Sequence, residues 1–547
     1  MSQARSYDAI IAGGGHNGLT TGAYLARAGL SVLVVERSDI VGGAAVSREL
    51  EPGWTYSNCS YVCSLLRPEV ARDLDLARHG LQVIPYTGGA SFTKGGEYFA
   101  YHHDHRALER EIARLSPRDV EGYERFARAV TRQCRFVRPL LLRSAPDPAT
   151  FHPRDLGEFL FLLRRLHDLG EREMGEAIRF WTASVGDFLD GFIEHPLIKA
   201  HLAGSGIIGT GLGVYSPGTA YVLLHHYMGD LDGAIGAWGF ARGGMGAVSA
   251  ALAGALREAG GDIRVNAEVE RILVKDGVAA GVVLRGGEEI FAPLVASNMD
   301  AKRTFLGCVE PGALPDDFLE AIRRFRIRGS SAKLNLALDG PPAFPAVAGD
   351  APFLSGDLHA SESLLELEAA YDDWKEGRFS AAPYFDMLIP SRIDPTMAPP
   401  GAHMASIFVQ YAPYDLERGG ARDPAHWDDA AREGLKAAVL DKIEAVSPGF
   451  RALIRHCELR TPVDIEREVG LTEGNIFQGE LTFDQLLFNR PVPGWARHRS
   501  PLPGLWLVGS SAHPGGGVMA AAGANAAREI LRDMKRGGRD EAAFRAA

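Results

Sequence analysis

A glycine pattern near the start of the chain strongly limits what it can fold into. Residues 9–12 form a short apolar run, the pattern Gly13-x-Gly15-x-x-Gly18 follows, and residues 19–28 have a helical pattern. The first glycine allows a tight turn, the second admits a pyrophosphate against the backbone, and the third allows close packing of helix on strand. This order predicts a Rossmann-type α/β unit that binds a dinucleotide at the start of its helix.

The residues that follow indicate which dinucleotide is bound. Glu36 ends a second, β-branched run, 18 residues after Gly18, where a carboxylate accepts hydrogen bonds from ribose hydroxyls. The pair Gly42 and Gly43 comes soon after. Many flavoproteins place such a pair close to the phosphates and ribityl chain of FAD, whereas NAD dehydrogenases usually continue into another helix. The sequence therefore favours FAD. A second GxGxxG, at residues 204–209, follows a helical pattern without a partner acid, and we interpret it as unrelated to nucleotide binding.

Composition excludes several other classes of protein. The 547 residues predict two to four structural units, and a net charge of −11 argues against nucleic acid as a partner. Five cysteines without CxxC spacing predict neither a zinc site nor a disulfide framework. The histidine-rich residues 102–105 are interpreted as a turn with Asp104 as a helix N-cap, so no metal site is expected.

Long sequence blocks carry a family resemblance. GGGHNGLTTGAYLARAGLSVLVVERSDIVGGAA, GFARGGMGAVSAALAGALREAGGDI, GNIFQGELTFDQLLFNRPVPG and LWLVGSSAHPGGGV together span nearly the whole chain. They resemble the phytoene-desaturase-like flavoproteins of the amine-oxidase and GDP-dissociation-inhibitor fold group, and most of all the branch of pyridine nucleotide-disulfide oxidoreductase domain-containing protein 2. The resemblance implies a Rossmann-type FAD-binding domain, FAD held without a covalent link, and a discontinuous α+β substrate domain.

The domain boundaries follow from these blocks. We expect the FAD-binding domain at residues 1–75, 232–305 and 490–547, and the substrate (cap) domain at residues 76–231 and 306–489.

Within these domains, residues 261–297 predict a β-meander with turns at Asp276-Gly277 and Gly286-Gly287. Residues 117–142 and 156–192 predict long amphipathic helices in the cap. Residues 200–224 contain no Asp, Glu, Lys or Arg, yet their many glycines predict a buried wall rather than a membrane span.

The resemblance also assigns residues to the cofactor. Those implied to contact FAD are Gly13, Gly15, Gly18, Glu36, Arg37, Gly42, Gly43, Val269, Gly509, Gly516, Gly517 and Val518. The loop at residues 515–517 is expected against the flavin, with a helix from 518 to 528 aimed at it. The positive end of that helix would stabilise the charge of a reduced flavin by a few tenths to about 2 kcal/mol. Carotenoid desaturases usually show HPGGGVPG where this chain has HPGGGVMA, which argues against a carotenoid substrate.

Three side chains are the catalytic candidates. His513 precedes Pro514 at the turn expected to face the flavin ring. His226 follows an apolar segment, and imidazole titrates close to neutrality. Gln485 belongs to the polar segment 478–490, which the resemblance places near the active site. A hydrogen-bonded structural histidine at 226 and a salt-bridged linker at 478–490 are the alternatives.

These observations predict an FAD-dependent oxidoreductase that transfers a hydride from an apolar organic substrate to flavin N5. Flavin-dependent polyene isomerisation, amine oxidation, and a flavin-bound interaction protein with little turnover are the alternatives. Cys59 and Cys63 lack the spacing of a redox pair, so disulfide chemistry is not expected. Because a second dinucleotide motif is missing, the expected electron acceptor is oxygen or a quinone.

The start of the sequence leaves no room for a signal peptide. We therefore expect an intracellular protein, cytoplasmic or membrane-peripheral, without a transmembrane helix. Contact with a membrane surface and homo-oligomerisation stay open.

Overall fold

A parallel sheet built from distant parts of the chain forms one half of the molecule. The computed structural model describes residues 7–231 and 233–546. The sheet has five parallel strands in the order β11-β2-β1-β15-β23. In that order the strands span Asp262–Arg264, Val32–Val35, Ala9–Ala12, Leu294–Ser297 and Leu505–Leu507. The order and the parallel pairing are those of a Rossmann-type unit, as the glycine pattern predicts.

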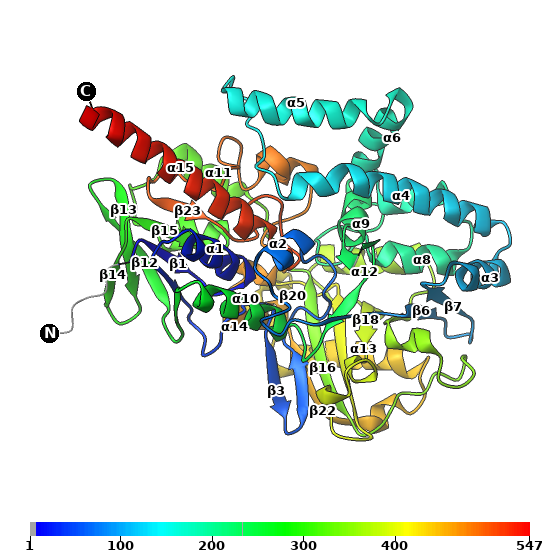
Figure 1. Cartoon of the computed structure of the whole chain (residues 1–547). Coiled ribbons are helices and arrows are strands. Elements are labelled where there is room, and N and C mark those ends of the chain that lie inside the picture. Colours follow the sequence, from blue (N-terminus) through cyan, green and yellow to red (C-terminus); the bar gives the residue numbers. More distant parts are fainter. Residues whose placement is uncertain (1–6, 232, 547) are drawn as a thin grey trace.

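Both faces of this sheet are covered, which explains its continuous apolar strands. Ala9 and Ile11 of β1 pack against three helices, α1 (His16–Arg27), α10 (Gly246–Glu258) and α15 (Ala521–Ala546), while Ile10 faces the opposite side. There the antiparallel strands β12, β13 and β14 cover the sheet (Figure 1). These three strands span Val269–Lys275, Val278–Leu284 and Glu289–Phe291. The predicted meander is thus confirmed, with positive φ at both predicted turns.

A second, larger sheet lies beside the first (Figure 1). Its seven strands run in the order β22-β16-β19-β18-β17-β6-β7, and all pairs are antiparallel except β17 with β6. In that order they span Ile454–Arg460, Ser331–Leu338, His403–Gln410, Tyr384–Leu388, Asp357–His359, Gly88–Phe92 and Tyr98–His102. One face packs on helix α13 (Asp429–Glu444), and the other packs on a layer of helices.

That helical layer is formed by residues that the sequence predicts to be amphipathic. Helix α4 (Asp119–Leu141) matches the first predicted helix. The second predicted helix is divided into three, because Gly170 has a positive φ of 83° and Ser184 caps a new helix. The three are α5 (Pro153–His167), α6 (Glu171–Thr182) and α7 (Val185–Asp190). Long amphipathic patterns therefore predicted the helical state correctly and the continuity wrongly.

The uncharged stretch at residues 200–224 lies inside the molecule, as predicted. It contains the end of α8 (Pro196–Gly204) and most of α9 (Thr219–Tyr227), whose apolar side chains belong to the core under the second sheet. Its GxGxxG therefore follows a helix rather than a strand. Asp104 caps α3 (His105–Leu115) by accepting a hydrogen bond from the amide of Ala107 at 2.7 Å, again as predicted. Within the described residues, no helix is both long and apolar enough to cross a lipid bilayer.

Smaller elements connect the two halves. The two-stranded sheets pair β3 (Ser47–Glu51) with β4 (Trp54–Ser57), β5 (Val83–Pro85) with β10 (Gly239–Ala241), β8 (Asp230–Leu231) with β9 (Ala234–Ile235), and β20 (Leu416–Arg418) with β21 (Ala421–Asp423). The remaining α-helices are α2 (Pro68–Asp73), α11 (Asp316–Arg324), α12 (Leu364–Lys375) and α14 (Pro462–Val469). The β5–β10 pair joins a segment predicted for the cap to one predicted for the FAD-binding domain.

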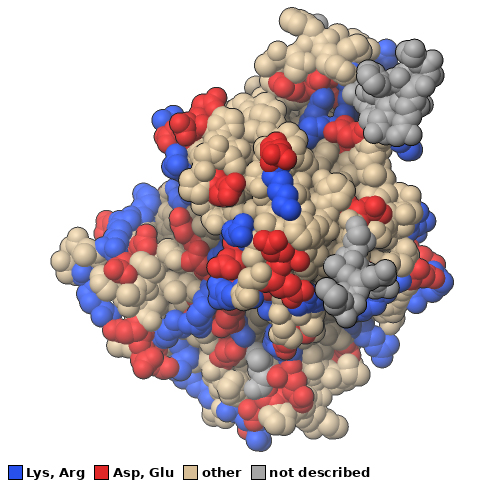
Figure 2. Space-filling model, turned by 90° about the vertical axis from the view of Figure 1, so that its left-hand side faces the viewer, with Lys and Arg blue, Asp and Glu red and all other residues tan. Residues whose placement is uncertain are grey.

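Charged side chains of both signs are mixed on the face shown in Figure 2. Arg48 with Asp39 and Arg78 with Glu258 are examples of exposed ion pairs of the molecule. Such pairs contribute little stability, and mixing keeps either sign from forming an extended patch on this face.

The first helix tests how tightly the glycine pattern constrains packing. A Cβ added at Gly18 would collide with the carbonyl oxygen of Gly13, while one added at Gly157 in α5 would meet nothing within 4 Å. We expect Gly18→Ala to lower the free energy of unfolding by about 1–3 kcal/mol. Gly157→Ala, the matched control in an exposed helix, is expected to raise it by up to about 1 kcal/mol. Thermal unfolding of both variants checks this; equal melting temperatures would contradict it.

Candidate active site

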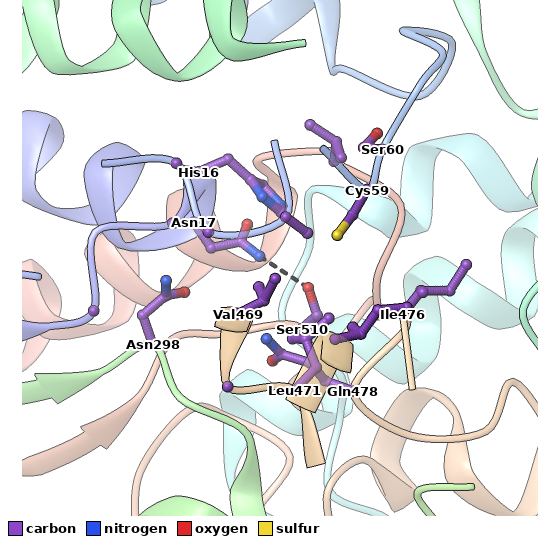
Figure 3. Close-up of a pocket in the computed structure, with 18 of the residues that line it drawn as sticks. His16, Asn17, Cys59, Ser60, Asn298, Val469, Leu471, Ile476, Gln478 and Ser510 are labelled. Carbon is purple, nitrogen blue, oxygen red and sulfur yellow. Dashed lines mark hydrogen bonds between the residues drawn. The ribbon is translucent and has the colours of Figure 1, made fainter. Parts of the chain in front are cut away.

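A deep cavity lies between the two sheets and is lined by both chain ends. It holds about 1740 Å³ of empty space, its mouth included. The Rossmann side contributes the start of α1 and the loop at Ser510–Val518, while the cap contributes residues of β16, β19 and the segment 465–478. Figure 3 shows His16 and Asn17 at one wall, Cys59 and Ser60 at another, and Leu471, Ile476 and Gln478 opposite them. Segments from both termini therefore meet around one site.

The glycine-rich end of the cavity is made of backbone. Gly13, Gly15, Gly42 and Gly43 line it, and Gly15 forms a β-bridge with Gly42. A Cβ at Gly15 would lie 2.8 Å from Nδ2 of Asn298, so a larger residue does not fit. Within the described residues, the first turn of α1 has no acidic side chain and no side-chain cap. Its amide groups are therefore suited to an anion such as a pyrophosphate.

Glu36 stands where a ribose acid is expected. Its carboxylate is nearly buried and accepts hydrogen bonds from the amides of Gly14 at 2.8 Å and Ser38 at 2.9 Å. These two bonds fix the carboxylate at the cavity wall, where it retains capacity to accept bonds from hydroxyl groups.

Beyond Glu36 the cavity wall becomes basic. Arg37, Val269 and Arg303 line this end, and Arg37 donates a hydrogen bond to the carbonyl of Arg467 at 2.8 Å. Burial and the nearby charge of Arg303 lower the pKa of Arg37 from its usual value. Two guanidinium groups at one wall favour a ligand that carries negative charge.

The C-terminal glycine loop closes the opposite end of the cavity. Gly517 has a φ of 117°, and a Cβ there would lie 2.6 Å from Leu65 and 3.0 Å from Nε2 of His225. Val518 and Ala520 also have positive φ, of 56° and 61°. The helix predicted to begin at residue 518 therefore begins only at Ala521, because residues in this conformation cannot continue a right-handed helix. Gly517 and Val518 nevertheless line the cavity.

Three hydrogen bonds join this loop and its helix to the first helix. Asn17 donates to Oγ of Ser510 at 3.2 Å and accepts from the amide of Gly523 at 3.3 Å (Figure 3 shows the first bond). Thr21 donates to the carbonyl of Gly523 at 3.1 Å. The starts of α1 and α15 are thus held side by side at the cavity.

Arg490 fixes the wall behind the loop. Its guanidinium is completely buried and donates to five backbone carbonyls at 2.8–3.3 Å, those of Phe477, Gly479, Glu480, Gln485 and Ser510. Burial lowers its pKa to about 10, so it stays charged at neutral pH. One side chain therefore ties the segment 477–485 to the loop that follows β23.

Most of the polar segment 478–490 has a structural role. Gln485 accepts from the amide of Arg326 at 2.7 Å and donates to its carbonyl at 3.0 Å. Glu480 is fully buried and accepts from Nε of Arg328 at 3.1 Å. Of this segment only Gln478 lines the cavity. The catalytic role predicted for Gln485 remains a prediction, without support from the cavity wall.

The two predicted histidines are placed differently. His226 lines the cavity, and its Nδ1 is 2.9 Å from the carbonyl of Val222. Nε2 of His513 is 3.1 Å from the carbonyl of Leu140 at the end of α4, and His513 is not among the residues that line this cavity. Burial lowers the pKa of each imidazole to about 4. A catalytic role for His513 therefore stays a prediction that this geometry does not support.

Three of the predicted cofactor glycines lie behind the wall rather than in it. A Cβ at Gly509 would lie 2.7 Å from the carbonyl oxygen of Asn298, and one at Gly516 would lie 2.7 Å from Cα of Phe477. Gly18 packs on Gly13, as described above. Their shape lets the lining segments approach one another, and direct contact with FAD remains a prediction for them.

Sequence reasoning missed the lysine of the cap. Lys333 of β16 lines the cavity, is 2% exposed, and places Nζ 4.0 Å from the ring centroid of Tyr61. In the part of the chain that the structure describes, Nζ has no hydrogen-bond partner. Burial lowers its pKa to about 7. A lone charged residue inside the apolar strand SAKLNLAL was the sequence signal that pointed to it.

The cysteines nearby are buried free thiols. Cys59 lines the cavity and Cys63 lies in the core beside it. Burial raises the pKa of Cys59 to about 11 and that of Cys63 to about 12, which keeps both protonated and weakly nucleophilic.

These residues fit FAD. Glycines that admit no Cβ surround the start of α1, Glu36 occupies the ribose position, and arginines line the far end. Fold and site together define a flavin-dependent oxidoreductase. The chain belongs to the flavin containing amine oxidoreductase family, whose sequence model matches residues 18–419.

Individual relatives extend over nearly the whole chain. It is 38% identical to pyridine nucleotide-disulfide oxidoreductase domain-containing protein 2 of Rattus norvegicus, over 97% of this chain and 94% of that protein. It is 27% identical to a limonene dehydrogenase protein of Castellaniella defragrans, over 98% and 96%. The structure of cyclohexylamine oxidase from Brevibacterium oxydans has the same fold, with a TM-score of 0.58, 18% identity, and coverage of 97% and 100%. The protein is thus an FAD-dependent oxidoreductase, as the sequence predicts.

Replacement of Arg490 tests its role in the wall. We expect Arg490→Lys to orphan at least two of the five buried carbonyls, because an ammonium group has three donors, and to lower the free energy of unfolding by about 2–6 kcal/mol. Arg326→Lys is the control, since its guanidinium is 41% exposed and bonds Asp484; about 1 kcal/mol or less is expected. Thermal unfolding and flavin retention measure both effects. Equal stability of the two variants would refute the assignment.

Proposed function

We propose that this protein removes a hydride and a proton from an apolar organic molecule bound at the cap end of the cavity. The walls there are apolar and aromatic: Leu65, Ile208, Trp238, Phe408, Ile476 and Phe477. FAD, when bound, supplies flavin N5 as the hydride acceptor. The name of the limonene dehydrogenase relative, which refers to an apolar hydrocarbon, also supports this substrate class.

The observation that carries the proposal is Lys333. Its buried amine faces an apolar cavity next to the cofactor groove, and burial brings its pKa to about 7. A neutral amine accepts a proton from a C–H or N–H group, and catalytic bases work best with a pKa near the operating pH. We therefore assign the proton acceptor to Lys333. His226, with a pKa of about 4, is a weaker base at the same cavity.

His226 and Trp238 shape the substrate end instead. Trp238 donates from Nε1 to the carbonyl of His226 at 3.0 Å, and the His226 ring lies 6.1 Å from that of Phe477. These contacts hold two aromatic groups at fixed positions against the substrate. Water is kept from the site, which raises the strength of its electrostatic interactions.

Electrons leave the site by a route that we assign to oxygen or a quinone. The Rossmann sheet accounts for the single predicted dinucleotide motif, and a small apolar oxidant reaches the same apolar cavity as the substrate.

Anaerobic titration of the holoprotein tests this function. Apolar alcohols, amines and unsaturated hydrocarbons are added in turn while the absorbance of the oxidised flavin is followed. A dehydrogenase loses this absorbance with at least one class of compound. Turnover that requires prereduced flavin would show an isomerase instead. A flavin that no member of the panel reduces or uses would overturn the proposal in favour of a binding protein.

Substitution of Lys333 tests the base. Because the competent form is the neutral amine, the rate of flavin reduction is expected to rise with pH through about 7 and then to level off. Lys333→Met is expected to remove this rise and to slow reduction on the order of 10²–10⁴-fold. The control is Lys275→Met, since the exposed Lys275 also stacks on an aromatic ring, at 4.5 Å from that of Phe291. A rising limb that survives in Lys333→Met would exclude this lysine.

A further inference from the structure

A row of buried polar side chains leads away from the cavity into the cap. It begins at Tyr61, which lines the cavity and stacks on Phe408 at 6.0 Å between ring centroids. The hydroxyl of Tyr61 donates to Oδ2 of Asp386 on β18 at 2.6 Å. Asp386 is 1% exposed, and its other oxygen, Oδ1, has no hydrogen-bond partner among the described residues. A buried carboxyl oxygen without a partner is costly and calls for an explanation.

The row continues through a histidine to a more accessible carboxylate. Ring nitrogens of His359 lie 2.8 Å from Oδ2 of Asp357 and 3.0 Å from the hydroxyl of Tyr384. A carboxylate oxygen of Asp386, a ring nitrogen of His359 and a carboxylate oxygen of Asp357 all lie within 4.8 Å of one another. A gap of that size between Asp386 and His359 is spanned by one water molecule. The side chain of Asp357 is 24% exposed, whereas that of His359 is 5% exposed.

The groups around this row determine its charge. Lys333 on β16 lies beside Tyr61, Tyr384 stacks on His359 at 5.5 Å, and His201 on α8 packs edge-on against His359 at 5.3 Å. Nδ1 of His201 is 2.9 Å from Oγ of Ser91, and burial lowers the pKa of His201 to about 4, so it is neutral. Tyr86 is also close enough for its pKa to be raised, first by burial and then by the charge of Asp386.

The two central groups exchange protons near neutral pH. Burial raises the pKa of Asp386 to about 6. Burial alone would lower the pKa of His359, but its hydrogen bond to Asp357 and the charge of Asp386 outweigh that effect and raise it. A carboxyl and an imidazole with such neighbouring pKa values transfer a proton in either direction at little cost.

We propose that Tyr61, Asp386 and His359 form a proton relay from the cavity to Asp357, which releases the proton to solvent. This inference rests on the proposed function, because the relay carries the proton that substrate oxidation sets free. Tyr61 gives its hydroxyl proton to Asp386 and receives one from Lys333 or the cavity. Asp386 passes a proton to His359 through the bridging water, and His359 passes one to Asp357. Each group ends in its starting state, so one proton crosses and no electrons move.

Infrared difference spectroscopy of the photoreduced holoprotein tests the relay without any substrate. Illumination with EDTA as electron donor reduces the bound flavin, and the spectrum of the oxidised protein is subtracted. We expect the carbonyl band of a protonated carboxyl group to change with flavin reduction. This band should be lost in Asp386→Asn and shifted in Tyr61→Phe, which removes one hydroxyl and keeps the ring. Carboxyl bands that are identical in the wild type and in both variants would overturn the relay.

A matched histidine provides the control. His403 belongs to β19 of the same sheet and has its own partner, with Nδ1 2.9 Å from Oγ of Ser391, but it lies away from the row. His403→Gln should leave the carboxyl band unchanged, whereas His359→Gln should shift it. Equal shifts in the two variants would show a general effect of the sheet and contradict the relay.

A kinetic measurement separates this inference from the proposed function. With any compound that reduces the flavin, Tyr61→Phe and Asp386→Asn are expected to slow reduction on the order of 10²-fold and to increase its solvent isotope effect, while KM changes little. If reduction proceeds at the wild-type rate in both variants, the relay is wrong and the oxidoreductase assignment stands. If no compound reduces the flavin, the proposed function fails, and the infrared result still decides whether the row carries protons.

Discussion

The buried guanidinium of Arg490 is the interaction on which the shape of the site depends. A charge removed from water is unfavourable unless its donors find acceptors, and here five carbonyl dipoles surround it. Those carbonyls belong to two segments that would otherwise repel each other, because both direct oxygen atoms toward the same point. Arg490 thereby converts two loops into one rigid wall. The left-handed residues Gly517, Val518 and Ala520 persist because the surrounding structure is fixed in this way.

Backbone and side chains divide the work of the site. The cofactor end is formed by glycine amides and a helix start, which need a particular backbone path rather than particular side chains. The cap end is formed by Lys333, Tyr61, Trp238 and Phe408, which come from strands and loops of the second sheet and its surroundings. Changes in the cap therefore alter the chemistry without disturbing the cofactor groove. This agrees with a family whose relatives have names of different activities over one fold.

Local patterns predicted what depends on neighbouring residues. The strand, turn and helix around Gly13, the turns at Asp276 and Gly286, and the cap at Asp104 are each set within a few residues, and the structure has all of them. The start of α15 was misplaced, since the positive φ of Val518 and Ala520 arises from contacts with distant segments. His513 was expected at the ring because it is adjacent to the glycine loop, yet its ring turns toward α4. Tyr61, Asp386 and His359 were missed altogether, because 325 positions separate Tyr61 from Asp386 and no sequence pattern links them.

The short ladder between β5 and β10 has a consequence for how molecules reach the interior. It pairs Ile84 with Phe240, and backbone bonds from Tyr86 to Trp238 and from Arg242 to Gln82 extend it at both ends. Separating the two sheets as rigid bodies would break this continuous set of bonds. The halves therefore stay docked through turnover, and an oily ligand must enter by the displacement of individual side chains along a fixed corridor.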